Sequence, residues 1–468
     1  MIDRRKGHFL SAFMFALVIL VGLSSAVMVA GNSAESGQER RNVILFIGDG
    51  MGFAHVDAAS SYRYGAFGRL VFETFPVRLA ATTYAEGGSY DPDHLWADFD
   101  NFRRGATDSA AAATALATGR KSYGGAIAVV GSREDYEPVR TIVHAATDRG
   151  MRAGVVTNVQ FAHATPAPFG AHNSHRSNYK EIAREMLLES SLDLIMGCGH
   201  PLFTNDARVR DEAENFDFVG GVDTWRALVT GRAGSTTDVA GTRERWRFIQ
   251  DRSDFIAMAD GPTPAMVCGV PMVATTLQQG RSGDRHAEPF EEPFNRNVPT
   301  LAEMTSAALN VLDRDGAGLF LMAEGGAIDW AGHSNQTGRM IEEMIDFADA
   351  VSAAVEWVEK NSSWDETLII VTSDHETGYL TGPRSGPGDE GEPPLWNPVQ
   401  NRGIAQVPGV EWHSGSHTNQ LVPVYARGVG AGLLVDYADK TDPVHGAYLD
   451  NTDIARVMFE VVGEPLAP

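Results

Sequence analysis

Metal-competent side chains follow an apolar run in the middle of the chain. The run begins at Leu319, and Glu324, Asp329 and His333 come directly after it. Strands of parallel sheets are near-continuous apolar runs, and ligands of such sheets bind beyond the carboxyl ends of the strands. Carboxylates and imidazoles are the side chains that hold divalent metal ions in proteins. We therefore expect metal-dependent chemistry at the end of this strand.

Two further apolar runs end in the same kind of residue. Residues 42–47 precede Asp49, which is flanked by glycines. Residues 367–372 precede Asp374 and His375. A lone aspartate after a strand is often only a helix cap, but flanking glycines let the backbone approach a ligand closely, which capping does not require. The economical interpretation is three strands of one sheet whose carboxyl ends converge on a site for several metal ions.

The alanine-rich stretch 104–119 carries polar residues near its start. Alanine has the highest helix propensity, so a helix that ends near Gly119 is expected. It would begin near Thr107, Asp108 and Ser109, each of which is a residue type preferred as an N-cap. Alternatively, Ser109 stands at the positive end of the helix dipole, where backbone N–H groups bind an anion beside its hydroxyl. The stretch alone leaves both interpretations open.

Apolar runs alternate with helical periodicity along most of the chain, and this alternation predicts βαβ units. The sequence therefore indicates an α/β fold, a three-layer sandwich with a large mostly parallel central sheet and helices on both faces. Residues 206–260 are charged and mixed and are interpreted as helices. The further strands expected are residues 153–159, 192–196 and 422–426, the last strand of the chain. The further helices expected are residues 179–189, 301–312 and 340–358.

The N-terminal segment, residues 1–30, has the features of an export signal. A basic cluster at residues 4–6 is followed by an almost wholly apolar run at residues 9–30. Residues 24–26 offer a small-residue cleavage site, which favours a cleaved signal peptide. The alternative is an uncleaved N-terminal membrane anchor, because the run is long for a signal peptide. Either way the rest of the chain is expected to be periplasmic or secreted.

The three site segments come from the beginning, middle and end of the chain. This favours one large domain at residues 41–468, after a polar tether at residues 31–40, over a string of separate domains. Residues 383–409 are rich in Gly, Pro and Glu. A loop of that length in a compact domain is usually functional or disordered. We expect an inserted surface loop near the mouth of the site.

The composition limits the partners of the chain. The formal net charge of −23 argues against nucleic acids and anionic membranes as partners, because both attract basic surfaces. No second long apolar run follows the N-terminal one, so no membrane contact is expected beyond an N-terminal anchor. The two cysteines, Cys198 and Cys268, form neither a disulfide scaffold nor a CxxC metal site. The sequence leaves open whether they form one disulfide or remain two buried thiols.

Seven motifs occur together and in one order. The set strongly resembles the alkaline phosphatase family, from about Asn42 to Ala426. Each motif alone would be a weak signal, but their order and internal spacing are those of the family. The motifs are Asp49-Gly-Met-Gly, Thr107-Asp108-Ser109-Ala110, His163-Ala-Thr165-Pro-Ala, Arg176, Glu324-Gly-Gly-Ala-Ile-Asp329-x-x-x-His333, Thr372-Ser-Asp374-His375-Glu-Thr-Gly378 and His417-Thr.

The resemblance implies two zinc ions and one magnesium ion. Mixed imidazole and carboxylate sets suit zinc, whereas all-oxygen sets suit magnesium. His163 stands where many bacterial relatives carry aspartate, and it is assigned to the third metal either directly or through a water molecule. The other implied ligands are Asp329, His333 and His417 for the first zinc, Asp374, His375 and Asp49 for the second, and Asp49, Thr165 and Glu324 for magnesium.

The resemblance also implies the parts of a phosphate site. Ser109 would be the nucleophile that becomes phosphoserine, and Arg176 would clamp the phosphate with its fork of N–H groups. Asp108 and Trp330 would contribute to substrate binding together with Arg176. Relatives carry Lys, His or Trp at position 330, and Trp adds no positive charge near the phosphate.

The sequence as a whole therefore indicates an exported alkaline phosphatase that hydrolyses phosphate monoesters through a phosphoserine intermediate. One alternative is a phosphodiesterase or sulfatase of the same superfamily, but Ser109 together with Arg176 favours a monoester dianion. Another is a non-catalytic exported protein that binds metal or phosphate, which would not need Ser109 at a helix start. The sequence leaves open the physiological substrate and whether the chain forms a homodimer.

Overall fold

The computed structural model describes residues 40–234, 244–389 and 392–466. The expected export segment, residues 1–30, lies outside the described residues, as does all of the expected tether except Arg40. Among the described helices, none is long and apolar enough to cross a membrane.

Strands and helices alternate along the chain. The strands are β1 (Asn42–Ile47), β2 (Val77–Thr82), β3 (Val129–Gly131), β4 (Tyr136–Pro138), β5 (Arg152–Gln160), β6 (Leu194–Cys198), β7 (Arg247–Ile249), β8 (Val267–Gly269), β9 (Leu319–Glu324), β10 (Thr367–Thr372), β11 (Glu376–Thr377), β12 (Leu380–Thr381), β13 (Glu411–Trp412), β14 (His417–Thr418), β15 (Val422–Gly428), β16 (Lys440–Asp442) and β17 (Gly446–Asp450). The α-helices are α1 (Phe53–Tyr64), α2 (Pro92–Leu95), α3 (Ser109–Thr118), α4 (Ile142–Asp148), α5 (Tyr179–Leu188), α6 (Val222–Val229), α7 (Arg252–Met258), α8 (Leu301–Leu312), α9 (Ala327–His333), α10 (Thr337–Asn361), α11 (Leu433–Tyr437) and α12 (Asn451–Val462). Short 3-10 helices are η1 (Val71–Thr74), η2 (Asn101–Arg103), η3 (Ala167–Phe169) and η4 (Phe216–Val219).

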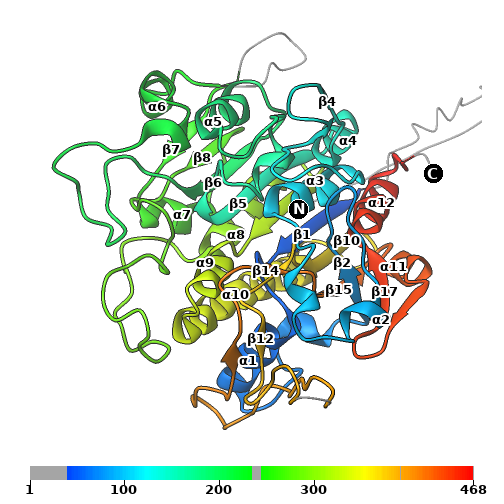
Figure 1. Ribbon diagram of the computed structural model, residues 1–468. Helices are drawn as coiled ribbons and strands as arrows, with labels where there is room; N and C mark the ends of the chain where they lie inside the picture. The colour runs from blue at the N-terminus through cyan, green and yellow to red at the C-terminus, as the bar shows by residue number, and fades with distance from the viewer. Residues whose placement is uncertain (1–39, 235–243, 390–391, 467–468) are drawn as a thin grey trace, which may run out of the picture. The chain divides into compact units, whose positions relative to one another are not determined.

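One 11-stranded sheet forms the centre of the fold, in the order β16-β17-β2-β15-β10-β1-β9-β5-β6-β8-β7 (Figure 1). Neighbouring strands from β10 to β7 in this order are parallel, and β15 is antiparallel to both β10 and β2. Every residue of β1, β9 and β10 is buried, as expected for strands covered on both faces. The predicted α/β fold with a large mostly parallel sheet is confirmed.

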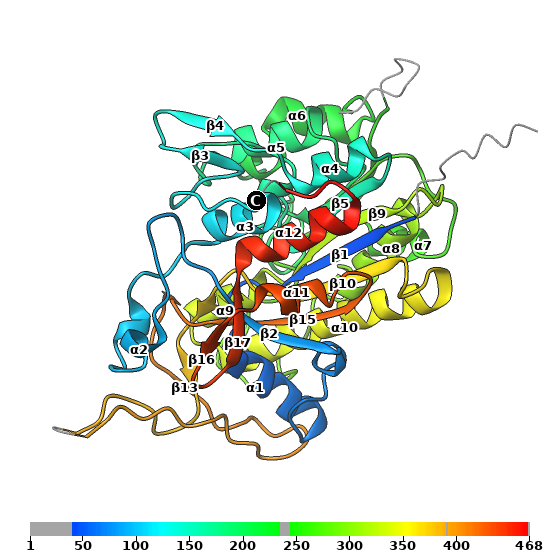
Figure 2. The same ribbon diagram turned by 90° about the vertical axis from the view of Figure 1, so that its right-hand side faces the viewer.

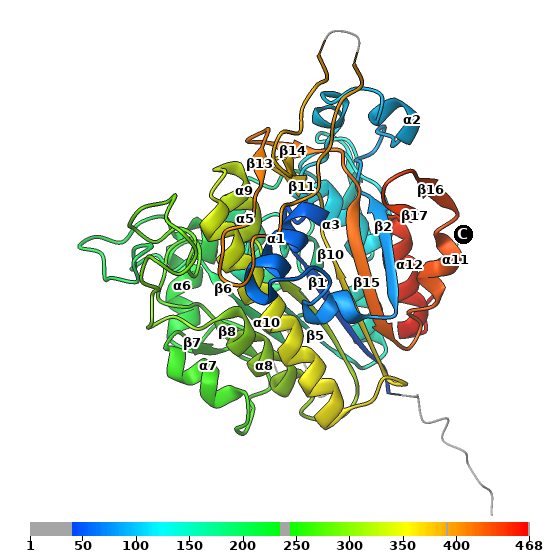
Figure 3. The same cartoon turned by 90° about the horizontal axis from the view of Figure 1, so that it is seen from below.

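The two faces of the sheet carry separate hydrophobic cores. Val43 and Leu45 of β1 belong to one core, together with residues of α3, α4, α5 and α12. Ile44 and Phe46 belong to the other, together with residues of α1, α8 and α10. Successive side chains of a strand point to opposite faces, so one strand contributes to both cores. Figure 2 shows α12 and α3 on one side of β1 and α10 on the other, and Figure 3 shows α10 and α1 together over the second face.

Short strands were missed in two places, so the all-helical interpretation of residues 206–260 and the prediction of a last strand at residues 422–426 need correction. Residues 206–260 contain helices α6 and α7, but they also contain β7, which pairs with β8 at one edge of the sheet. Residues 422–426 form most of β15, but β16 and β17 follow it, and β17 pairs with β2. These strands are short and partly exposed. They therefore lack the apolar run that marks a buried strand in a sequence.

The expected surface loop is bounded by β12 and β13, which pair with each other. The described parts of residues 383–409 contact α1. The Ser61 hydroxyl donates to Asn401 Oδ1 at 3.0 Å, and the Ala405 N–H donates to the Tyr62 carbonyl at 2.8 Å. The described portion of the loop is therefore attached to the helix that follows β1.

Both cysteines are free thiols. Cys198 ends β6, and Cys268 lies in the neighbouring strand β8. Burial raises the pKa of both thiols, because it disfavours the thiolate. Of the two alternatives that the sequence left open, the structure has the pair of buried thiols.

Candidate metal and phosphate site

The carboxyl ends of β1, β9 and β10 lie side by side at one edge of the sheet. The strands run parallel and in register, so that Ile47 is level with Glu324 on one side and with Thr372 on the other. Asp49 follows β1 and Asp374 follows β10. Acidic residues from the beginning, middle and end of the chain therefore lie at the same edge of the sheet.

Gly50 allows the three segments to meet. Its φ of 75° lies in the left-handed region that favours glycine. A Cβ atom at this position would lie 2.8 Å from Asp329 Cα and 2.9 Å from Thr377 Oγ1. The backbone after β1 thus approaches the other two segments more closely than any residue with a side chain would permit.

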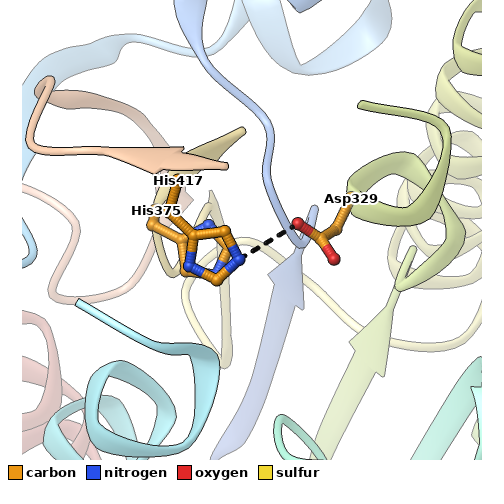
Figure 4. A group of neighbouring side chains, drawn as sticks. All are labelled: Asp329, His375 and His417. Atoms are coloured by element: carbon orange, nitrogen blue, oxygen red, sulfur yellow. Dashed lines mark ion pairs between the residues drawn. The ribbon is translucent and has the colours of Figure 1, made fainter. Parts of the chain in front are cut away.

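Two compact clusters of metal-competent side chains result. Asp329, His375 and His417 form one, and Asp49, Asp374 and His375 form the other; the candidate ligand atoms within each cluster lie within 4.8 Å of one another. Figure 4 shows the stacked rings of His375 and His417 on one side and the Asp329 carboxylate opposite them. His375, which the resemblance assigned to the second zinc alone, is shared by both clusters.

His333 lies beside the first cluster. Its Nε2 atom is 3.2 Å from Nε2 of His417 and 3.3 Å from Oδ2 of Asp329. Asp329 and His333 are four residues apart on α9, so the helix presents both on one face. The three residues that the resemblance assigned to the first zinc are therefore together.

The three imidazoles are oriented by hydrogen bonds from their other ring nitrogen. His333 Nδ1 donates to the Gly415 carbonyl at 2.8 Å, and His417 Nδ1 donates to the Thr107 carbonyl at 2.9 Å. His375 Nδ1 lies 3.2 Å from the hydroxyl of Thr377. Partners of this kind fix the tautomer of a metal-binding histidine. They leave each Nε2 atom directed at the cluster.

Oxygen atoms gather on the other side of Asp49. The Thr165 hydroxyl donates to Asp49 Oδ2 at 3.2 Å, and Glu324 accepts a hydrogen bond from Thr157. An all-oxygen group of this kind suits magnesium. His163 belongs to neither compact cluster. Its ring lies 5.7 Å from that of Trp330, and its buried Nδ1 has no hydrogen-bond partner among the described residues.

The buried oxygens of these clusters fit metal ions. Asp49 Oδ1, Glu324 Oε1 and Asp374 Oδ2 are buried, and no described group donates a hydrogen bond to them. Burial, and then the neighbouring carboxylates, raise the pKa of all three residues. Burial, with His417 and His333 nearby, lowers the pKa of His375 and favours the neutral imidazole that binds metals. Uncompensated buried carboxylates are costly, and divalent cations would supply the missing charge.

Ser109 is the first residue of α3 and lies against the clusters. Its Oγ atom is 3.2 Å from His375 Nε2 and 3.5 Å from Arg176 Nη1. Asp108 is the N-cap, since its carboxylate accepts from the N–H groups of Ala110 and Ala111 at 3.3 Å. The capping interpretation therefore holds for Asp108, while anion binding at Ser109 stays a prediction. Because Asp108 caps the helix, the Ser109 hydroxyl is not needed for capping and faces His375 and Arg176 instead.

Arg176 is held in place by Asp108. Its Nη1 atom lies 2.9 Å from Asp108 Oδ2, and the Gly125 N–H donates to the same carboxylate at 2.9 Å. Burial alone would raise the pKa of Asp108, but the charge of Arg176 and these hydrogen bonds lower it below its usual value. Asp108 thus stays ionised and fixes the guanidinium beside Ser109.

The serine and the clusters open into one cleft of about 650 Å³. Its lining includes the candidate site residues Ser109, His163, Arg176, Asp329, Trp330, His333 and His417. The lining of the same cleft also includes Asn205, Thr275, Gln279 and Arg285. The cleft is large enough for a phosphate ester with a substantial alcohol part.

Several residues that shape the site were not identified from the sequence. Thr377 donates to Asp329 Oδ1 at 2.5 Å and stands inside one of the motifs, so the motif itself was a signal. Thr157 lies in β5, where no pattern distinguishes it from other strand residues. Asn205 and Thr275 come from loops that neither a motif nor an apolar run marks.

A buried hydrogen-bond chain supports the helix that carries two of the candidate ligands. The Asn158 side chain accepts from the Ala327 N–H at 3.1 Å and donates to Glu343 Oε2 at 2.9 Å. All three residues are buried. Ala327 begins α9, which carries Asp329 and His333. Asn158 therefore fixes α9 against the end of β5.

Replacing Asn158 by alanine is expected to weaken metal binding and lower kcat together, by about 10- to 100-fold, as observed for supporting partners of metal ligands. The replacement leaves the Ala327 N–H and the Glu343 carboxyl without their partner. Competition with a chromophoric zinc chelator measures the affinity. Asn310→Ala is the control, because Asn310 donates to backbone carbonyls at the end of α7 and beyond it. Unaltered zinc affinity in the Asn158 variant would contradict the role given to this chain.

The fold and the site together define a class of protein. Clusters of carboxylates and imidazoles at the carboxyl edge of a parallel sheet, beside a serine at a helix N-terminus and an arginine, are those of an α/β metallohydrolase that handles phosphate. The sequence model of the alkaline phosphatase family matches residues 40–392. The chain belongs to this family and is a phosphoric monoester hydrolase, which confirms the resemblance seen in its motifs.

Individual relatives agree with this assignment. The chain is 26% identical to alkaline phosphatase 3 of Bacillus subtilis, over 96% of each chain. It is 30% identical to streptomycin-6-phosphate phosphatase of Streptomyces griseus, over 93% of this chain and 95% of that protein. Its fold is similar to that of a cold-active alkaline phosphatase from a psychrophilic Shewanella, with a TM-score of 0.63 and 26% identity, over 90% of this chain and 99% of that one.

Proposed function

We propose that the chain hydrolyses phosphate monoesters in two steps, with Ser109 as the nucleophile. One observation carries this proposal. Ser109 is the first residue of α3, and its hydroxyl lies between Arg176 and His375 of the metal-competent clusters. A helix N-terminus, an arginine and cations all favour an anionic group at this hydroxyl. A protein that only bound phosphate would not require a nucleophile there.

We further propose that the site holds two zinc ions and one magnesium ion. The proposed ligands are Asp329, His333 and His417 for the first zinc, Asp49, Asp374 and His375 for the second, and Asp49, Thr165 and Glu324 for magnesium, with His163 close to the third metal. When bound, such ions polarise phosphate oxygens and stabilise the charge that develops on the attacking and leaving oxygens.

Ser109 accepts the phosphoryl group, and the residues around it position the substrate. The Ser109 hydroxyl loses its proton as its oxygen attacks phosphorus in line with the ester bond. A new oxygen–phosphorus bond forms while the bond to the alcohol oxygen breaks, and that oxygen takes up a proton and leaves as the alcohol. Water then cleaves the phosphoserine, which restores the Ser109 hydroxyl and releases inorganic phosphate. Arg176 donates to two phosphate oxygens in both steps, because its fork matches their spacing. Asp108 holds the guanidinium in position, and Trp330 borders the alcohol part of the substrate.

Replacing Arg176 by alanine is expected to lower kcat/KM by about 10²- to 10³-fold, the typical cost of losing one preorganised donor to the transition state. Inhibition by inorganic phosphate should weaken as well, because the product uses the same fork. Arg176→Lys should recover only part of the loss, since a lysine lacks the fork. Arg152→Ala is the control, because it removes an arginine–aspartate pair of similar length, 2.8 Å, away from the cleft. Unchanged phosphate inhibition in Arg176→Ala would refute the assignment.

We also propose that the chain is exported and acts in the periplasm or as a secreted protein. The support is the basic cluster at residues 4–6 followed by the apolar run at residues 9–30. The proposed ligand set is consistent with that location, because it consists of imidazoles and carboxylates rather than of thiols, which oxidise.

A further inference from the structure

We propose that the wall of the cleft around Arg285 binds a second anionic group on the substrate. The preferred substrates are then phosphate monoesters whose alcohol part carries a carboxylate or another phosphate. This inference rests on the proposed reaction at Ser109, because that reaction places the alcohol part of the ester in the cleft. The wall consists of Asn205, Thr275, Gln279 and Arg285, and it is called the Arg285 wall below.

The described part of the chain offers no ion-pair partner to Arg285. Within residues 40–234, 244–389 and 392–466, no carboxylate forms an ion pair with it, although the chain as a whole has a net charge of −23. The other arginine in the cleft, Arg176, is paired with Asp108 and lies beside Ser109. An exposed guanidinium that lines the cleft and has no ion-pair partner among the described residues is available to a ligand.

Asn205, which lines the same cleft, offers a hydrogen-bond donor to the same ligand. Asn205 Oδ1 already accepts from the Thr275 N–H at 2.9 Å and from the Thr275 hydroxyl at 2.8 Å. These bonds fix the amide of Asn205 with its oxygen turned to Thr275. In the part of the chain that the structure describes, no group accepts a hydrogen bond from the Asn205 Nδ2 atom. The Asn205 amide N–H groups and the Arg285 guanidinium are therefore the donors of this lining that can recognise an anion.

The Arg285 wall is built on a fixed backbone. The buried Arg339 donates from Nη1 to the Arg281 carbonyl at 2.8 Å and also to the Gln279 carbonyl. Arg281 and Glu342 form an ion pair at 2.8 Å, and each side chain is only 2% exposed. The Gln279 amide in turn donates to Gln336 at 3.0 Å. Anchors of this kind reduce the ordering cost that a mobile binding loop would incur.

The direction of the reaction brings the alcohol part toward this wall. The transferred phosphoryl group is bound between Ser109, Arg176 and the metal ligands. In an in-line displacement the alcohol leaves on the side opposite the attacking oxygen. It must therefore project into the rest of the cleft, whose lining includes Arg285. A cationic alcohol part would be repelled there, whereas an anionic one would be attracted.

The test compares substrates that differ in the charge of the alcohol part. 6-Phosphogluconate carries a carboxylate at the far end of its six-carbon chain, glucose 6-phosphate is neutral there, and phosphocholine carries a permanent positive charge. We expect the metal-loaded wild-type enzyme to have its highest kcat/KM on 6-phosphogluconate. The ratio of kcat/KM for 6-phosphogluconate to that for glucose 6-phosphate should fall as salt is added, because an exposed charge is screened.

Arg285→Ala is expected to lower kcat/KM for 6-phosphogluconate by about five- to tenfold, the order of one charge-assisted hydrogen bond at a partly exposed site. Glucose 6-phosphate should be affected less than about twofold, because its alcohol part makes no ion pair with the guanidinium. Arg285→Glu should reverse the preference, so that kcat/KM is higher for phosphocholine than for 6-phosphogluconate. Arg69→Ala is the matched control, because it removes an exposed arginine of the loop between α1 and η1. It should leave kcat/KM unchanged for all three substrates.

The possible outcomes separate this inference from the proposed function. If wild-type enzyme hydrolyses glucose 6-phosphate but shows no preference for 6-phosphogluconate, the anion site is wrong and the phosphatase assignment stands. If Arg285→Ala changes both sugar phosphates equally, Arg285 acts on the fold of the cleft rather than on the second anion, and the inference is also overturned. If none of the three esters is hydrolysed, the proposed function fails and this inference fails with it.

Discussion

Replacing Ser109 by alanine will lower kcat for phosphate monoesters by about 10³-fold or more, the scale seen when a catalytic nucleophile is removed. The variant lacks the oxygen that we propose as the acceptor of the phosphoryl group, so the proposed route through phosphoserine is closed. It keeps Arg176, Asp108 and the metal ligands. A small residual rate from direct attack by water on the bound ester is therefore expected.

Mass spectrometry of acid-quenched enzyme checks the covalent step directly. Wild-type protein mixed with a monoester should gain one phosphoryl group on the peptide that contains Ser109, and Ser109→Ala should gain none. Ser61→Ala serves as the control, because Ser61 is a buried serine of α1 that bonds to Asn401 outside the cleft. A phosphoryl group found on any residue other than Ser109 would remove the basis of the mechanism.

Removing the metal ions is expected to abolish activity, with a loss on the order of 10³-fold or more. The ions contribute several kcal/mol to transition-state stabilisation, and each 1.4 kcal/mol corresponds to a factor of ten in rate. Thermal stability should fall as well, because Asp49, Glu324 and Asp374 would remain buried without counter-charges. Activity and the melting temperature of the chelated protein, measured side by side, show both effects.

Restoration by specific ions tests the ligand sets. Zinc together with magnesium should restore full activity, whereas calcium should not, because it prefers oxygen ligands and the two main clusters contain imidazoles. The bound ions can be counted by elemental mass spectrometry of the reconstituted protein. Replacing His417 by alanine should reduce the zinc count, while Thr165→Val should reduce magnesium first. Full activity of exhaustively metal-free protein would show that the clusters have another purpose.

Much of the fold could be predicted because its central strands are buried on both faces. β1, β9 and β10 are continuous apolar runs for this reason, and the polar residues that end them are therefore conspicuous. The edge strands β7, β16 and β17 are short and partly exposed, so nothing in their composition distinguishes them from loops. Their place in the sheet depends on neighbours that are distant in the chain.

The same division applies to the site. The sequence by itself determined the residue types and the local spacing, such as Asp108 with Ser109 at a helix start and Asp329 with His333 one helical turn apart, because local backbone geometry sets such spacing. Only the tertiary structure decided that His375 is shared between two clusters and that Asn158 supports α9. The tertiary structure also shows that Arg285 and Ser109 line the same cleft. Contacts between distant segments depend on how the sheet and its loops pack, and that packing leaves no periodic or local signal in the sequence.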